Sequence, residues 1–218
     1  MPLVLISLCN AIGSCIMVGK DYEGSKNVIR DYHMHPQIIT KPELFAQFVE
    51  TARKNGIEEI CITDHMPLIG SSLKDRLPAG SVREYCETAK RLKEQYRDVL
   101  SVKIGIEIDY HPTVTDQIRR VLEDDGFREE DCKDVIDDVL NIIAAKGLHL
   151  EINTHLAVSQ NDLSSVYPSP MILSMAAEKN IPFSFGSDAH KPEDVGALLP
   201  ELRKSPVYGK AIRTWEAT

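Results

Sequence analysis

The sequence predicts an α/β fold of one domain, in which parallel strands alternate with helices. Short apolar runs typical of buried strands alternate along the chain with segments whose apolar residues recur at helical spacing. Side chains of the kinds that bind metal ions directly follow several of the strand-like runs. The 218 residues, of which 43% are hydrophobic and 27% charged, are enough for a soluble globular domain with a sizeable core.

The first predicted elements form a strand–helix–strand unit. Residues 28–32 are expected to form the first strand, and residues 59–63 the second. Between them, Thr40 and Glu43 have the spacing of a capping box, which predicts the start of a helix. Asn55–Gly56 is a typical helix stop. Because a helix separates the two strands, we expect them to be parallel.

The later elements continue the same alternation. Residues 66–81 are rich in Pro, Gly and Ser and are expected to form a loop. The remaining elements, in chain order, are a charged surface helix at 81–97, a strand at 102–108, a helix at 132–146, a strand at 148–153, a helix opening at Ser169–Pro170 and a strand at 182–185. Five strands are therefore recognisable.

Residues 1–27 are predicted to be an N-terminal extension. They are mostly apolar from Leu3 to Val18 but a little short for a membrane span. They lack the positive charge that normally precedes the core of a signal peptide, although a cleaved signal is an alternative. We expect an extension that either packs on the body of the domain or is poorly ordered.

The overall charge and the cysteines indicate the class of partner and the compartment. A formal net charge of -8 at pH 7 argues against a nucleic-acid partner, which usually requires a basic face. It is compatible with a small anionic substrate, because bound metal ions can reverse the local charge of a site. The five cysteines are scattered and form no CxxC pair, which favours a reducing compartment such as the cytoplasm.

Metal-binding side chains follow four of the five predicted strands. In chain order they are His33 and His35, Asp64 and His65, Glu107 and Asp109, and Asp188 and His190. In a parallel barrel the carboxyl ends of the strands meet at one rim, where active sites are built. Residues two apart on an extended chain point the same way, so His33 and His35 can face one ion, as can Asp188 and His190.

These side chains suit the hydrolysis of a phosphate ester. Imidazole nitrogen combined with carboxylate oxygen favours Zn²⁺, Mn²⁺ or Fe²⁺. A carboxylate such as Glu107 can bridge two ions, which together activate a water and stabilise the phosphate oxyanions, so that no Ser or Cys nucleophile is needed. Each motif alone has a structural explanation, such as a helix cap for Asp188. Their joint position after strand-like runs favours a site.

Six segments carry a distinctive set of motifs. They are Asp31-Tyr-His33-Met-His35, Ile62-Thr-Asp64-His65, Gly105-Ile-Glu107-Ile-Asp109-Tyr-His111-Pro112, Leu150-Glu151-Ile-Asn153-Thr154, Tyr167-Pro168-Ser169 and Gly186-Ser-Asp188-Ala-His190-Lys-Pro192-Glu193. The set resembles the motifs of the PHP (polymerase and histidinol phosphatase) family, and most closely those of its histidinol-phosphatase branch. The resemblance implies a PHP-type phosphoesterase domain at 28–218. It also implies a distorted seven-stranded (β/α) barrel, incomplete here because about five of seven strands are recognisable.

The resemblance also implies up to three metal ions. One divalent ion, Zn, Mn or Fe, would be held by His33, His35, Glu107 and Asp188, all of which are present. His65 and His190 would hold a second ion or bind the substrate phosphate. Asp64 would orient a neighbouring histidine or bind metal. The residues expected to be catalytic are Asp64, His65 and His190.

The chain departs from the family pattern in three places. No histidine follows the His33-x-His35 pair closely, where the family has a ligand of the third ion. Between Phe127 and Arg128 the family has a block with two strands and both histidines of the second ion. After Asn153-Thr154 this chain has His155 and lacks the arginine that would suit a phosphate.

Some of these losses could be compensated within the chain. His149 and His155 could replace lost ligands, with surface or loop positions as the alternative, and His111 is expected to be structural or to support a ligand. The missing strands would expose two sheet edges, and the apolar stretch within residues 1–27 could cover an edge.

The function implied by the resemblance is that of a phosphoric monoester hydrolase. It would convert L-histidinol phosphate to L-histidinol and phosphate in the cytoplasm, as part of histidine biosynthesis. Two alternatives stay open: a non-catalytic or metal-binding remnant of such an enzyme, and a PHP phosphoesterase with another substrate. We expect a small phosphorylated substrate, no nucleic acid or membrane partner, and leave open a homo-oligomer.

Overall fold

The computed structural model describes residues 3–7, 15–18, 28–65, 76–78, 80–109 and 133–216. Its strands are β1 (Leu3–Ser7), β2 (Cys15–Val18), β3 (Arg30–Asp31), β4 (Glu59–Ile62), β5 (Ser101–Asp109), β6 (His149–Asn153) and β7 (Phe183–Gly186). Its α-helices are α1 (Phe45–Lys54), α2 (Val82–Gln95), α4 (Lys133–Lys146), α5 (His155–Gln160), α6 (Pro170–Glu178), α7 (Leu199–Lys204) and α8 (Gly209–Glu216). Three 3-10 turns, η1 (Pro42–Leu44), η3 (Leu163–Ser165) and η4 (Pro192–Asp194), connect them.

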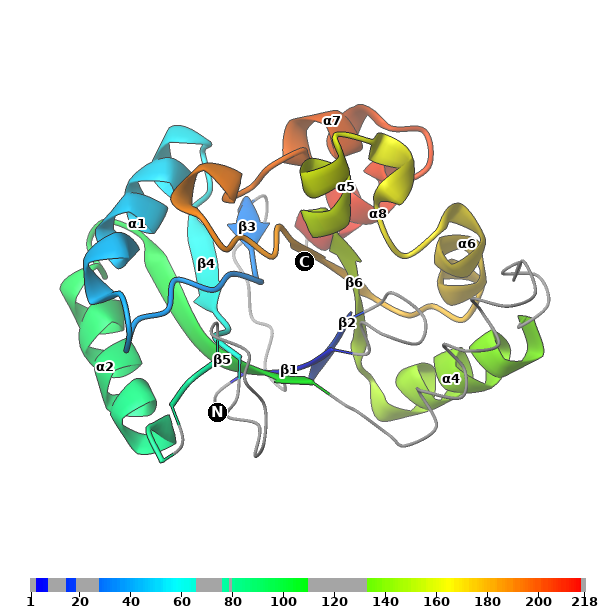
Figure 1. The fold of residues 1–218 in the computed structure, drawn as a ribbon. Coiled ribbons are helices and arrows are strands. Elements are labelled where there is room, and N and C mark those ends of the chain that lie inside the picture. Colours follow the sequence, from blue (N-terminus) through cyan, green and yellow to red (C-terminus); the bar gives the residue numbers. More distant parts are fainter. Residues whose placement is uncertain are drawn as a thin grey trace.

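The strands that the structure describes form one sheet in the order β3-β4-β5-β1-β2-β6-β7. Figure 1 shows them around the centre of the molecule, with α1 and α2 outside one half and α4 and α6 outside the other. The predicted strands all exist, and β3, β4 and β5 are parallel, as are β6 and β7. The prediction of an α/β fold with an incomplete, distorted barrel is confirmed.

β1 and β2, at the N-terminus, take the place of the two strands that are missing from the middle of the sequence. β1 pairs in parallel with β5, with Leu5 opposite Glu107. β2 pairs with β1 and, antiparallel, with β6, where Met17 lies opposite His149. The apolar stretch therefore covers both of the edges that the missing block would leave open, which agrees with the hypothesis that it covers an edge. The division of the chain into 1–27 and 28–218 stays a prediction.

The predicted capping box before α1 is wrong. The backbone N–H groups of Thr40 and Lys41 both donate to the carbonyl of Gln37, so this segment is a turn. The helical region begins only at Pro42, whose fixed φ suits the first helical turn. The predicted stop is confirmed, because Asn55 caps α1 and Gly56 follows with a φ of 72°.

Apolar faces of the helices pack against the outside of the sheet and fix the strand positions. Phe45 and Phe48 of α1 share a core with Ile60 of β4. On the opposite side, Trp215 of α8 packs edge-on against Tyr32, with ring centroids 5.6 Å apart. These contacts hold the strand ends that carry the polar residues. In the described part of the chain, no helix is both long and apolar enough to cross a membrane.

Candidate metal centre

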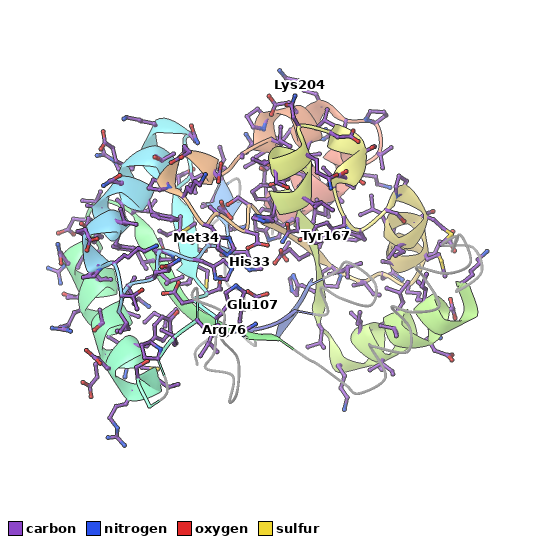
Figure 2. The ribbon with its side chains drawn as sticks, viewed as in Figure 1. His33, Met34, Arg76, Glu107, Tyr167 and Lys204 are labelled. Carbon is purple, nitrogen blue, oxygen red and sulfur yellow. The ribbon has the colours of Figure 1, made fainter. Side chains whose placement is uncertain are left out.

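The segments that continue β3 and β7 are joined at the rim of the sheet. The backbone N–H of His35 donates to the carbonyl of Ala189 at 2.8 Å, and the N–H of Asp188 donates to the carbonyl of His33 at 2.8 Å. These bonds bring the first and last motifs side by side. Figure 2 shows His33 and Glu107 next to each other near the centre of the molecule.

Four buried side chains converge at this rim, and we call His33, His35, Glu107 and Asp188 the inner set. The Nε2 atoms of His33 and His35 are 3.0 Å apart. Glu107 Oε2 lies 3.3 and 3.2 Å from these two nitrogens, and Asp188 Oδ1 lies 3.5 and 3.0 Å from them.

These five distances fit a metal ion. Metal–ligand distances of 2.0 to 2.2 Å in a tetrahedral site place neighbouring ligand atoms ~3.4 Å apart. In addition, Asp188 Oδ1 is buried and accepts no hydrogen bond. A buried carboxylate oxygen without a donor is costly, and a cation would satisfy it. The ligand atoms of His33, His35 and Asp188 all lie within 4.8 Å of one another, and Glu107 Oε2 lies beside the two histidines, so these residues fit a divalent ion.

The charges of the inner set stabilise one another. Burial acts to lower the pKa of His33, but the carboxylates around it outweigh burial and raise its pKa well above the usual value. Burial acts to raise the pKa of Glu107, but His33 and hydrogen bonds from the neighbouring histidines hold it well below its usual range. Burial also acts to raise the pKa of Asp188, but the positive charges of His33 and His35 lower it. Both carboxylates are thus ionised and ready to bind a cation.

A carboxylate behind the inner set orients His33. Glu151 of β6 is fully buried, and its Oε1 lies 2.9 Å from His33 Nδ1. A histidine ligand usually donates its second ring nitrogen to such a carboxylate, which leaves Nε2 free for the metal. Glu151 stands in one of the sequence motifs, but the sequence alone does not indicate its role. A single acidic residue between the apolar residues of a buried strand is the signal that could have identified it.

Two further residues on the same side keep this arrangement in place. Asn153 donates to Glu151 at 2.7 Å and to Asp188 Oδ2 at 3.4 Å. At Gly186 a Cβ atom would lie 2.6 Å from the Cβ of His33 and 2.7 Å from the Glu151 carboxylate. Only glycine leaves room there for β7 to approach the site.

His65 and His190 lie beside the inner set, on the more exposed side. Both of their rings stack against the ring of His35, with centroid distances of 4.2 and 4.3 Å. His65 Nδ1 is 2.9 Å from Glu107 Oε2. Burial and the positive charge of His35 lower the pKa of His190 to about 4, so its ring is neutral at pH 7.

Asp64 has a different environment. It is buried, and its two carboxylate oxygens accept the backbone N–H groups of Gln37 and Ile38 at 2.9 and 3.0 Å. It therefore fixes the turn that follows His35. Asp64 belongs to none of the candidate ligand clusters formed by the described residues. Its catalytic role stays a prediction.

The histidines that could replace lost ligands differ in whether they join a candidate ligand cluster. His155 forms a candidate ligand cluster with Asp188 and His190. His149 belongs to none of the clusters in the described part of the chain. His111 and the side chain of Asp109 lie outside the described residues.

Comparisons with known proteins agree with this fold. The model of the PHP domain matches residues 31–128, and that of the PHP-associated family matches residues 170–203. Histidinol-phosphatase from Bacillus subtilis is 24% identical over 256 residues, covering 77% of this chain and 95% of the relative. A Deinococcus radiodurans protein named "Probable histidinol-phosphatase" is 22% identical, covering 72% of this chain and 84% of the relative.

A solved structure shares the fold. Histidinol phosphate phosphatase from Lactococcus lactis, complexed with zinc, L-histidinol and phosphate, superimposes with a TM-score of 0.59 at 15% identity, covering 88% of this chain and 94% of that one. The first family match includes three of the four residues of the inner set, His33, His35 and Glu107. The chain thus matches the PHP domain over residues 31–128 and resembles the histidinol-phosphatases that carry this domain.

Proposed function

We propose that this chain is a metal-dependent phosphomonoesterase that hydrolyses L-histidinol phosphate to L-histidinol and phosphate. The observation that supports this most is the spacing of the inner set, in which five distances between ligand atoms lie between 3.0 and 3.5 Å. The substrate is suggested by the similar Lactococcus lactis enzyme, whose structure contains zinc, L-histidinol and phosphate.

The inner set would hold one divalent ion, with Zn²⁺, Mn²⁺ and Fe²⁺ best suited to its nitrogen and oxygen donors. A bound ion supplies a Lewis acid that lowers the pKa of a water and neutralises phosphate charge. The protein's part is to keep the ligands in place and ionised. Glu151 orients His33, and Asn153 holds the second carboxylate oxygen of Asp188.

The half-buried histidines at the rim are the candidates for contact with the substrate. The rings of His65 and His190 stack against that of His35, where they can contact the phosphate or hold a second ion. In the hydrolysis, the oxygen of a water bonds to phosphorus and the bond from phosphorus to the L-histidinol oxygen breaks. The proton from the water passes to that leaving oxygen, so the products are the free alcohol and phosphate. A role in histidine biosynthesis and a cytoplasmic location stay predictions.

A hydrolysis assay tests the proposal. The full chain is stripped with EDTA, reloaded with Zn²⁺ or Mn²⁺, and assayed for phosphate release from L-histidinol phosphate and a panel of other phosphate esters. We expect release that requires metal and is fastest with L-histidinol phosphate. Faster release from another ester would indicate a different substrate. Metal binding without release from any ester would identify a non-catalytic remnant.

A further inference from the structure

We propose that His155, Asp188 and His190 form a second site for a divalent cation, and we call these residues the outer set. One ligand atom of each residue lies within 4.8 Å of those of the other two. His155 lies outside the ligands that the family resemblance implies. The inference rests on the proposed function, because the outer set shares Asp188 with the inner set.

The backbone of Asp188 orients both imidazole rings. Its carbonyl oxygen lies 3.2 Å from His155 Nδ1 and 3.0 Å from His190 Nδ1. His190 Nδ1 also lies 3.6 Å from Asp188 Oδ1. The Nδ1 atoms are therefore the ring nitrogens turned toward Asp188, and they are the ones that a cation shared with its carboxylate would bind.

The ligand atoms of His35, His65 and His190 also lie within 4.8 Å of one another, so His190 is common to two candidate clusters. The outer set is the one that contains His155, whose ring centroid lies 5.2 Å from that of His190 at an interplanar angle of 54°.

The chain positions both ends of the outer set precisely. Asn153 Oδ1 accepts the backbone N–H of His155 at 2.9 Å, which fixes the start of α5. Asp188 has a φ of 53°, a conformation that non-glycine residues seldom adopt. Such strain is commonly retained at functional sites. In this backbone conformation, the carboxylate of Asp188 lies beside the inner set, and its carbonyl oxygen faces His155 and His190.

The donors indicate the class of cation. Two imidazoles with one carboxylate suit Zn²⁺ or Co²⁺ and are poor ligands for Mg²⁺ or Ca²⁺, which prefer oxygen. His155 and His190 are only half-buried. Three protein ligands with one side open resemble a catalytic zinc site, in which a water or substrate oxygen completes the coordination.

Metal content tests the outer set without an activity measurement. The full chain and two variants, His155→Asn and His149→Asn, are loaded with Zn²⁺, desalted and analysed for metal and protein. His149→Asn is the matched control, because it makes the same change at a histidine outside both sets. We expect about two ions per chain for the wild type and the control, and about one for His155→Asn. Equal contents in His155→Asn and the wild type would overturn the proposal.

A spectroscopic variant distinguishes a metal ligand from a structural residue. In His155→Cys loaded with Co²⁺, a ligand at position 155 would produce a thiolate-to-cobalt charge-transfer band that the Co²⁺ wild type lacks. A residue that only supports α5 would not produce it, so absence of the band in folded, cobalt-loaded protein contradicts the outer set. The result is independent of the proposed function: a band without phosphate release from any ester would retain the site and refute the enzyme.

Discussion

The inner set and the outer set share Asp188, but the protein holds them in different ways. His33 and His35 are almost completely buried, and a buried carboxylate, Glu151, supports His33 from behind. His155 and His190 are half-buried, and a backbone carbonyl orients both. The inner set is therefore built to retain an ion, whereas the outer set is built to leave one side open. We expect the inner site to bind its ion more tightly and to be required for all activity.

The largest difference in kcat/KM should appear between two variants, one that removes a histidine from the inner set and one that removes a histidine from the outer set. We expect His33→Ala to lower kcat/KM by more than the roughly 10- to 100-fold typical of changes to residues behind the ligands, because it removes a ligand and the ion pair of Glu151. His155→Ala should lower kcat/KM less and leave the inner ion bound. Steady-state kinetics combined with metal analysis measures both effects. A larger loss of kcat/KM in His155→Ala than in His33→Ala would reverse the comparison.

Replacement of Glu151, which supports His33, should have the next largest effect, on the metal affinity of the inner site. Glu151→Gln keeps the shape of the side chain but removes the charge beside His33 Nδ1. We expect metal affinity of the inner site to fall roughly 10- to 100-fold. Titration with Zn²⁺ against a competing chelator measures it, and Glu178→Gln, an exposed glutamate on α6, serves as the control. An unchanged affinity in Glu151→Gln would show that Glu151 does not support the ligand.

Removal of metal should reverse the dependence of stability on pH. In the chelated protein the pKa of His33 is raised, so its ion pairs stabilise the fold fully below pH ~6.5 and are lost as pH rises through the elevated pKa. In the loaded protein, protons compete with the metal, so stability should rise with pH over the same interval.

Melting temperatures with EDTA and with Zn²⁺, from pH 6 to pH 9, test this reversal. At 100-fold excess of free metal over Kd, the ion should add about 2.7 kcal/mol of stability. Parallel curves with and without metal would mean that the ion does not bind through His33.

The smallest expected effect on activity is that of Asp64→Asn. The amide can accept only one of the two N–H groups that the carboxylate now binds, so the variant should lose about 1–3 kcal/mol of stability. Once folded and loaded, it should keep kcat within a few-fold of the wild type. Denaturant unfolding and kinetics separate the two quantities. A large fall in kcat at unchanged stability would instead show a catalytic role for Asp64.

The sequence predicted the elements whose signals are local. The five predicted strands and the stop of α1 at Asn55–Gly56 follow from apolar runs and a glycine with positive φ. The inner residues were identifiable because each follows a strand, and parallel strands end at one rim. Local spacing led to a wrong prediction at Thr40, because its backbone N–H donates to the carbonyl of Gln37 in a turn.

The parts that the sequence did not predict depend on contacts between distant segments. β1 and β2 enter the sheet between β5 and β6. Their paired residues, such as Leu5 with Glu107 and Met17 with His149, are more than a hundred residues apart, and only the expected open sheet edge pointed to this pairing. The role of Glu151 depends on His33, 118 residues earlier in the chain. His155 gained a candidate role only when the φ of Asp188 brought one carbonyl to both imidazoles.

Crystals of the zinc-loaded chain, measured at the zinc absorption edge, would test the central claim most directly. We predict an anomalous peak within ~2.0–2.2 Å of His33 Nε2, His35 Nε2 and a carboxylate oxygen of each of Glu107 and Asp188. A zinc-loaded crystal with no peak between these four atoms, or with peaks only elsewhere, would contradict the account.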